Sequence, residues 1–230
     1  MKALAVCSGG LDSTTAAAHA LRIDGLDTTL LYFRYGCRAE LREMEAVRRI
    51  ADALGVDARF EDMRWLGRIG GSSLTSPHSE LAEGESGAEY AHEWVPARNL
   101  LMIAAAAALC DAQGFGAIYL GLNLEESAAY PDNTIEFYEK MNEIMPFATM
   151  SRPEIRNPLA RMMKWQIVRR ARELGAPIHL SWSCYRAGAR HCGRCGPCYM
   201  RQRAHRMNCL PDSVAYETPM GIEEPTVRHG

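Results

Sequence analysis

The chain has 230 residues, 47% of them hydrophobic, which is enough to bury a full core in one large domain, alone or with a small appendage. Its formal net charge of -2 argues against a protein that coats nucleic acid, because tight binding to a phosphate backbone needs a basic excess. The longest apolar run, Leu100 to Cys110, is too short to span a membrane, and Met1-Lys2 leads into a strand-like run without a signal-peptide pattern. We therefore expect a cytoplasmic protein that acts on a small molecule and binds neither nucleic acid nor membrane.

From the N-terminus, short apolar runs alternate with longer stretches of helical periodicity. The predicted strands cover residues 3–6, 28–33, 58–63 and 117–121, and the third is the weakest. Predicted helices cover residues 12–24, 41–54, 98–113 and 165–174, and a glycine follows each of the first three. This alternation predicts an α/β fold in which helices cover both faces of a doubly wound parallel sheet. Ligands of such folds bind at the carboxyl ends of the strands.

Two segments interrupt the alternation. Residues 67–93 are rich in glycine and serine, and from Glu80 onward they contain five glutamates and no lysine or arginine. A solvated loop is the plainest interpretation, although loops of this length are often lids. Beyond Leu210 the chain has three prolines and no apolar periodicity, so we expect this tail to be ordered only where it docks on the body or on a second subunit.

The stretch SGGLDSTT, which begins at Ser8, joins the first predicted strand to the first predicted helix. Its glycines let the backbone come close to a ligand, and the unpaired N–H groups of a helix start form a cradle for phosphate. The hydroxyls of Ser8, Ser13 and Thr14 can donate to phosphate oxygens, and Asp12 could orient a magnesium ion. No lysine follows the glycines, so the loop is not the one of kinases and motor ATPases. The alternative is a glycine turn without a ligand.

Four of the eight cysteines form a C-x7-C-x2-C-x2-C array near the C-terminus. In a reducing compartment such a cluster indicates a metal site rather than disulfides, and four thiolates suit a tetrahedral zinc ion. Glycine and proline between the cysteines let backbone amides turn toward the sulfur atoms. An iron–sulfur cluster is the rival occupant, but the usual Cys-Pro partner is absent. His191 and His205 are alternative ligands that the four cysteines make unnecessary. The predicted ligands are Cys184, Cys192, Cys195 and Cys198.

The six residues from Ser8 to Ser13 resemble the Ser-Gly-Gly-x-Asp-Ser loop of the ATP pyrophosphatases, a group that includes GMP synthetase, NAD synthetase and several tRNA-thiolating enzymes. The resemblance implies an adenine nucleotide alpha hydrolase-like, Rossmann-like fold that cuts ATP between its α and β phosphates and passes AMP to a substrate oxygen. AMP is a good leaving group, so an adenylated carboxylate is open to attack by an amine. Fixed cations must neutralise charge on the phosphates, and Arg98 and Lys164 are the candidates. For each, the alternative is a solvated surface cation.

Three further motifs and the cysteine array narrow the resemblance to the 7-cyano-7-deazaguanine synthases of queuosine and archaeosine biosynthesis. The motifs are YGCRAE, VPARN and YPDNTIEF, and the resemblance runs from Lys2 to about Asn208. It implies a ligase that uses ATP with Mg²⁺ to adenylate 7-carboxy-7-deazaguanine. Ammonia then displaces AMP to give the amide, and a second adenylation of the amide oxygen lets AMP depart as the nitrile forms. The resemblance also implies a homodimer and one structural Zn²⁺ per chain, held in a small C-terminal helical region.

The same resemblance assigns roles to individual residues. Asp12, Arg98 and Lys164 would be catalytic, and an aromatic ring and an acid would face the purine-like ring of the substrate. For AAYPDNT, the alternative is a proline turn that caps a helix. The ATP-binding residues would be Ser8, Gly9, Gly10, Leu11, Asp12, Ser13 and Thr14, and the substrate-binding residues would be Tyr35, Arg98, Asn99, Tyr130 and Asp132.

The chain departs from the branch at two motifs. Cys37 and Ala39 replace a common glutamine and histidine, and Ala128, Ala129, Asn133 and Thr134 replace residues of the common Ser-Gly-Tyr-Pro-Asp-Cys-Arg. These changes bear on the substrate or the product, so a related ligase that forms an amide or conjugates the deazapurine stays open. A tRNA-thiolating enzyme is a more remote alternative, because no added RNA-binding or basic region is visible. We expect an ATP-pyrophosphatase domain over residues 1–180, a zinc-binding region over 181–210 and a tail over 211–230.

Overall fold

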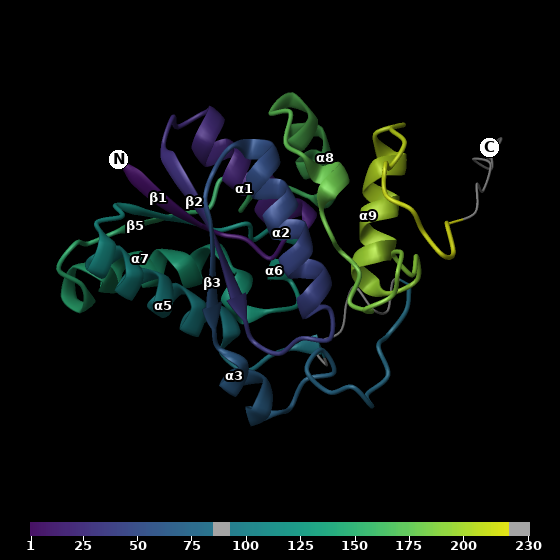
Figure 1. Ribbon diagram of the computed structural model, residues 1–230, viewed down its shortest axis with the longest axis horizontal. Helices are drawn as coiled ribbons and strands as arrows, with labels where there is room; N and C mark the ends of the chain where they lie inside the picture. The colour runs from purple at the N-terminus through teal and green to yellow at the C-terminus, as the bar shows by residue number, and fades with distance from the viewer. Residues whose placement is uncertain (85–92, 221–230) are drawn as a thin grey trace, which may run out of the picture.

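The computed structural model describes residues 1–84 and 93–220, and a parallel sheet lies at its centre (Figure 1). The strand order is β3-β2-β1-β4-β5, and every neighbouring pair is parallel. Ala5 lies opposite Leu30 of β2 and Tyr119 of β4. The predicted parallel α/β sheet is therefore confirmed. Its strands are β1 (Lys2–Val6), β2 (Asp27–Arg34), β3 (Ala58–Asp62), β4 (Ala117–Tyr119) and β5 (Glu154–Arg156).

Helices cover both faces of the sheet (Figure 1). One face packs against α1 (Leu11–Arg22) and α2 (Glu40–Leu54), and the other against α5 (Arg98–Gln113) and α7 (Ile135–Ala148). The C-terminal helices extend the first layer sideways, because α8 packs on α1 and α9 packs on α8. The remaining elements are α3 (Arg64–Ile69), α6 (Leu124–Ser127), η2 (Pro131–Asn133), α8 (Lys164–Glu173), η3 (Ile178–Leu180) and α9 (Gly196–Met207).

The strands are apolar on both sides, as a sheet covered by two helical layers requires. Leu4 and Ile118 belong to the core that includes α5 and α7, whereas Ala5 and Leu30 belong to the core that includes α1 and α2. On α1, the side chains that face the sheet are small, and Ala17 and Ala20 are both fully buried against it. These alanines let α1 lie close to the sheet, which brings the start of the helix to the carboxyl ends of the central strands.

Sequence periodicity missed the strand β5, the short helices α3, α6, η2 and η3, and the longer helices α7 and α9. The strand β5 has only three residues, too few to show a pattern. The helix α7 begins at Ile135 and its N-cap is Thr134, whose side-chain oxygen accepts a hydrogen bond of 3.1 Å from the Phe137 N–H, so the turn YPDNT does cap a helix. The helix α9 begins at Gly196, within the cysteine array, where the metal pattern hides the helical one.

The two irregular segments are partly anchored to the body. In the segment 67–93, α3 runs to Ile69 and Glu83 forms an isolated bridge with Cys195, while residues 85–92 lie outside the described residues. In the tail, Tyr216 pairs with His191 and the Met220 N–H donates to Gln202 Oε1 at 2.7 Å. Residues 211–220 thus dock on the body, and residues 221–230 are not described. Within the described part of the chain, no helix has the length and apolar character needed to cross a membrane.

Candidate active site

A cavity of about 220 Å³ lies at the carboxyl ends of β1 and β4, the place where the strand order changes direction. Nine residues predicted from the sequence line it: Ser8, Gly10, Leu11, Asp12, Ser13, Tyr35, Arg98, Asn99 and Lys164. Six charged, polar or aromatic residues that the sequence did not single out also line it: Glu43, Glu126, Trp182, Ser183, Tyr185 and Arg201. The fold therefore collects groups from both halves of the chain at one place.

Glycines fix the path of the loop that follows β1. Gly9 has a φ of +76°, and a Cβ there would lie 2.9 Å from the Glu43 carbonyl oxygen. At the end of β4, a Cβ on Gly121 would lie 2.8 Å from the Ser13 nitrogen. The loop can therefore sit against both α2 and β4 only because these positions have no side chain.

The hydroxyls of the loop differ in what they can reach. Ser8 and Ser13 line the cavity, and their Oγ atoms lie 3.2 Å apart. Thr14 is fully buried, and its hydroxyl donates to the Gly10 carbonyl at 2.7 Å inside the helix. Neither Gly9 nor Thr14 is among the lining residues, so Gly9 shapes the loop and Thr14 supports it from behind.

A cluster of charges lies beside the loop, at the start of α8. The ammonium of Lys164 pairs with Asp12 and lies 3.2 Å from Glu126 Oε1. Asn123 Nδ2 also donates to Asp12 Oδ2, at 3.0 Å. Burial by itself would lower the pKa of Lys164, but the two carboxylates raise it, so the ammonium stays charged.

Asp12 has one oxygen left for a ligand. Its Oδ2 accepts from Lys164 and Asn123, whereas its Oδ1 is buried and has no hydrogen-bond partner among the described residues. An unpaired buried carboxylate oxygen beside a phosphate cradle suits a hard divalent cation such as Mg²⁺. The residues present thus fit the ion that the loop motif implies.

Arg98 is a cation without an acidic partner in the described part of the chain. Its guanidinium carbon lies 5.5 Å from the centre of the Tyr35 ring, and its Nη1 lies 3.5 Å from the Tyr35 hydroxyl. Ala97, which precedes it, adopts a φ of +52°, a conformation that costs energy and sets the direction in which α5 begins. Arg98 is therefore available to a phosphate or a carboxylate in the cavity.

A smaller recess of about 30 Å³ adjoins the main cavity and shares Arg98 with it. It is lined by the two other predicted substrate residues, Tyr130 and Asp132. Asp132 Oδ2 accepts from the Asn99 N–H at 3.2 Å, which fixes the acid against the start of α5. Glu93 also lines the recess. The five predicted substrate residues are thus divided between two adjacent spaces.

Two of the departures from the branch pattern lie at this site. Cys37 is buried behind the cavity, where its Sγ donates to Glu43 Oε2 at 3.4 Å. Tyr32 donates to the same oxygen at 2.8 Å, and burial raises the pKa of Glu43. Asn133 lines both spaces and accepts from Asn99 Nδ2 at 3.1 Å. These substitutions therefore touch the walls of the site and not residues 8–14, the loop after β1, which we call the phosphate loop.

The four predicted cysteine ligands are buried together in the cysteine region, which we define as residues 178–220. Their sulfur atoms lie within 4.8 Å of one another, and zinc at its usual distance from four thiolates separates them by about 3.8 Å. The backbone N–H groups of Arg186 and Cys192 donate to Cys184 Sγ at 3.3 and 3.4 Å. Buried thiolates with N–H donors fit a structural zinc ion.

The two histidines near the four cysteines contact other residues instead of joining the metal-ligand group. His191 Nε2 accepts from the Ser183 N–H at 3.1 Å, and its ring lies 4.4 Å from that of Trp182. Burial and the charge of Arg201 lower the pKa of His191 to about 4, which keeps the ring neutral. His205 lies 3.7 Å from Asp212. Neither histidine belongs to the metal-ligand group, as the sequence analysis expected.

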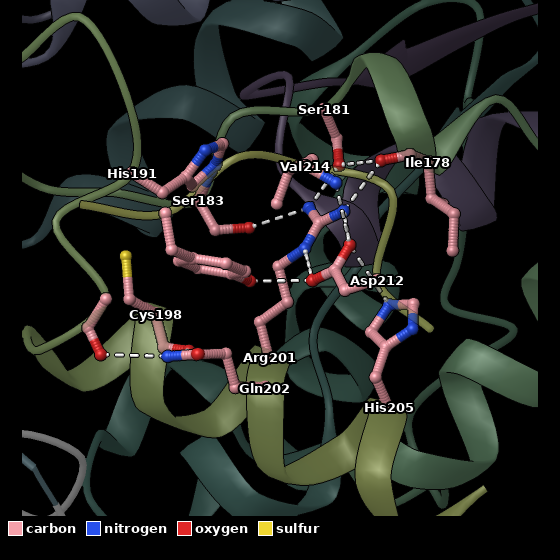
Figure 2. A network of polar contacts seen from close by, with 12 residues as sticks. Ile178, Ser181, Ser183, His191, Cys198, Arg201, Gln202, His205, Asp212 and Val214 are labelled. Atoms are coloured by element: carbon pink, nitrogen blue, oxygen red, sulfur yellow. Dashed lines mark hydrogen bonds and ion pairs between the residues drawn. The ribbon is translucent and has the colours of Figure 1, made fainter. Parts of the chain in front are cut away.

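Arg201 links the cysteine region to the cavity (Figure 2). It is 2% exposed and binds both oxygens of Asp212 in the docked tail, at 2.8 and 3.0 Å. It also donates to Ser181 Oγ, Ser183 Oγ and the Ile178 carbonyl. The segment it holds carries Trp182, whose backbone N–H donates to the Gly9 carbonyl at 2.8 Å. The tail, the cysteine region and the phosphate loop are therefore one connected structure.

The chain is similar in sequence to known proteins. A sequence model of the family described as "Queuosine biosynthesis protein QueC" matches residues 2–209. The "7-cyano-7-deazaguanine synthase 2" of Sulfurisphaera tokodaii is 48% identical over 221 residues, which cover 94% of this chain and 48% of that protein. The "7-cyano-7-deazaguanine synthase" of Methanothrix thermoacetophila is 39% identical over 227 residues, which cover 94% of this chain and 99% of that protein. This chain thus spans about half of the first relative and nearly all of the second. Among solved structures, NMN synthetase from Francisella tularensis covers 91% of this chain and 77% of its own, with a TM-score of 0.49 and 15% identity.

Proposed function

The chain belongs to the QueC family of queuosine biosynthesis proteins, and we propose that it is an ATP-dependent carbon–nitrogen ligase. Its substrates would be 7-carboxy-7-deazaguanine and ammonia, and its product 7-cyano-7-deazaguanine, as the names of its relatives suggest. One observation carries this proposal: a single cavity joins a glycine-shaped phosphate loop, the Lys164–Asp12 pair and Arg98, a cation to which no described residue gives an acidic partner. These are the groups that adenylation of a carboxylate requires.

In this proposal the loop residues bind the β and γ phosphates of ATP, which leave together as pyrophosphate. Ser8 and Ser13 donate their hydroxyls, and the backbone N–H groups at the start of α1 point toward the same anion. Lys164 neutralises charge that builds up on the leaving group. Mg²⁺ on Asp12 Oδ1 would add a second positive charge beside the phosphates.

Arg98 would hold the substrate carboxylate against the α phosphate. Its position between the two spaces lets it contact an anion in the cavity while a planar ring lies toward Tyr130 and Asp132. Tyr35 supports the guanidinium from one side, and Asn99 fixes the loop that carries Asp132. Holding both reactants in one orientation lowers the entropic cost of each adenylation.

The zinc ion would be structural in this scheme. The cysteine region supplies Trp182, Ser183 and Tyr185 to the cavity wall, and all three lie within two residues of the ligand Cys184. A bound Zn²⁺ would hold this wall in place without contacting the reacting atoms.

The protein would act as a homodimer in the cytoplasm. At the end of α7, Ile144 is 51% exposed, Phe147 90% and Met150 93%. Exposed apolar side chains that adjoin one another often form an interface, and a second copy of the chain could cover them. Light scattering would give the mass of a dimer, and Phe147→Glu would shift it toward the monomer.

Product analysis tests the proposed activity. The purified protein is incubated with ATP, Mg²⁺, 7-carboxy-7-deazaguanine and ammonium, and the products are identified by mass. The nitrile should appear with AMP and pyrophosphate, at two molecules of each per nitrile because both adenylations use ATP. Amide as the sole end product would identify a related amide-forming ligase. ADP and phosphate as primary products would contradict the assignment of the loop.

A further inference from the structure

Glu93 is a buried acid with no role in the steps above. It is 4% exposed, and its Oε1 is buried without a hydrogen-bond partner among the residues that the structure describes. It lines the small recess beside the main cavity. An unpaired buried carboxyl group destabilises a protein, so a ligand that pairs with it recovers binding energy there.

The walls of the recess suit a flat ring. The side chains of Trp94 and Tyr130 are stacked, with ring centres 6.1 Å apart and an angle of 16° between the planes. Leu74 and Val95 add apolar surface. Arg98 is the one cation among the described lining residues of the recess, and it makes no ion pair with Glu93. No described residue supplies N–H donors to the Glu93 carboxylate, and a ligand in the recess can supply them.

We propose that Glu93 binds the edge of the deazaguanine ring that carries the ring N1–H and the 2-amino group. This inference rests on the proposed function. The edge presents two parallel N–H donors, which match the two oxygens of one carboxylate. A hypoxanthine-like ring lacks the 2-amino donor and an adenine-like ring lacks both donors, so Glu93 determines specificity for the guanine type of ring.

The orientation agrees with the proposed chemistry. When the N1–H and 2-amino edge enters the recess, the five-membered ring and its 7-carboxylate point back toward the main cavity. Arg98 lies at the border of the two spaces, and Lys164 and the phosphate loop line the larger one. Asp132 is less suited to read the edge, because its Oδ2 already accepts from the Asn99 N–H.

The test removes each side of the proposed contact in turn. Calorimetry measures the binding of 7-carboxy-7-deazaguanine and of its analogue without the 2-amino group to the wild type, Glu93→Gln and Glu93→Ala. Glu80→Gln is the control, because Glu80 is exposed on the same segment of chain. Binding of Mg²⁺ and ATP to each variant shows that the phosphate site is folded.

The wild type and Glu80→Gln should bind the parent compound about tenfold to a hundredfold more tightly than the analogue. In Glu93→Ala this ratio of affinities should fall to about one. In Glu93→Gln it should lie between that value and the wild-type ratio, because one acceptor oxygen remains. A ratio that stays at the wild-type value in both Glu93 variants would overturn the role of Glu93 while the proposed function stands. If the wild type binds neither compound, both proposals are wrong. If Glu93→Ala does not fold, the ratio in Glu93→Gln decides.

Discussion

The phosphate loop and the cysteine region face each other across one cavity, yet they are held together in different ways. The backbone of the loop is fixed by the sheet and by glycines, and its charged groups keep unpaired atoms such as Asp12 Oδ1. In the cysteine region, Arg201 gives hydrogen bonds to four residues, and the four sulfur atoms are grouped for one ion. A substitution in the loop should therefore change the chemistry, whereas one in the cysteine region should change stability first.

Asp12→Ala is expected to have the largest effect and to separate the two regions most clearly. It removes the carboxylate that orients Lys164 and the oxygen available to Mg²⁺, so pyrophosphate release should fall by about a thousandfold. The midpoint of thermal unfolding should change little, because Lys164 keeps its ion pair with Glu126 and Asp12 belongs to no apolar core cluster. Asp52→Ala, on the exposed side of α2, is the control. A folded Asp12→Ala protein with wild-type turnover would refute this role.

Cys195→Ala addresses the cysteine region directly. Loss of one of four ligands should release the metal and lower the free energy of unfolding by about 4 kcal/mol, because the binding energy of a structural ion is folding energy. Elemental analysis and urea denaturation measure the two effects. Cys209→Ala is the matched control, since Cys209 is exposed and lies outside the ligand group. Visible absorbance with stoichiometric iron in the wild type would indicate an iron–sulfur cluster in place of zinc.

Asp212→Ala tests the contact through which the tail reaches the cavity wall. The substitution leaves the buried Arg201 guanidinium without its carboxylate, which should cost about 3 kcal/mol of unfolding free energy. Although burial raises the pKa of Asp212, Arg201 lowers it below its ordinary value. The stabilisation is therefore present above the ordinary pKa of aspartate and is lost as the pH falls through the lower value. Urea denaturation at neutral and acidic pH measures both effects. Glu217→Ala, exposed in the same tail, should keep wild-type stability, and an equally stable Asp212→Ala protein would show that the tail is not needed.

The sequence predicted most of the sheet because its strands are short apolar runs that glycines and polar residues separate. It could not reveal β5, whose three residues contain one buried side chain, Ile155. It also missed α9, where glycine, proline and cysteine suggest a metal loop, although the helix is formed by tertiary packing against α8. The local sequence pattern is thus enough to predict the central strands. The outer elements β5 and α9 depend on long-range contacts that the pattern does not show.

The candidate site shows the same limit. The phosphate loop and the cysteine array were visible because each is contiguous in sequence. The contact of Lys164 with Asp12 joins residues 152 positions apart, and that of Asn123 with Asp12 joins residues 111 apart. In the sequence, Glu126 and Arg201 are surrounded by other charged residues, a pattern that is typical of a solvated helix surface. The signal that would have exposed Glu93 is its burial, which only the fold provides.

The smallest expected effect is the pH dependence of substrate binding. It tests Glu93, which lines the recess beside the cavity that the phosphate loop and the cysteine region share. Burial, and then the charge of Glu126, raise the pKa of Glu93 to about 8. The two N–H donors of the ring bind the ionised carboxylate of Glu93 and not its protonated form. Below this pKa, Glu93 must therefore lose its proton before the ring can bind. The affinity should be constant above about pH 8 and fall by about tenfold for each pH unit below it.

Most of the other groups that line the recess do not share this titration. Arg98 stays charged, burial raises the pKa of Tyr130 to about 12, and Glu126 has a lowered pKa because, despite its burial, it lies beside Lys164. Burial raises the pKa of Asp132, although the hydrogen bond from the Asn99 N–H and the charge of Arg98 oppose this shift. Burial raises the pKa of Tyr185 well above its usual value. Calorimetry in buffers of different ionisation enthalpy would measure both the slope and the proton released. Because Glu93→Gln has no proton to lose, its affinity should be flat across the same range. If the affinity of Glu93→Gln still fell with decreasing pH, the proton would come from another group, and the claim that ionised Glu93 binds the ring would be wrong.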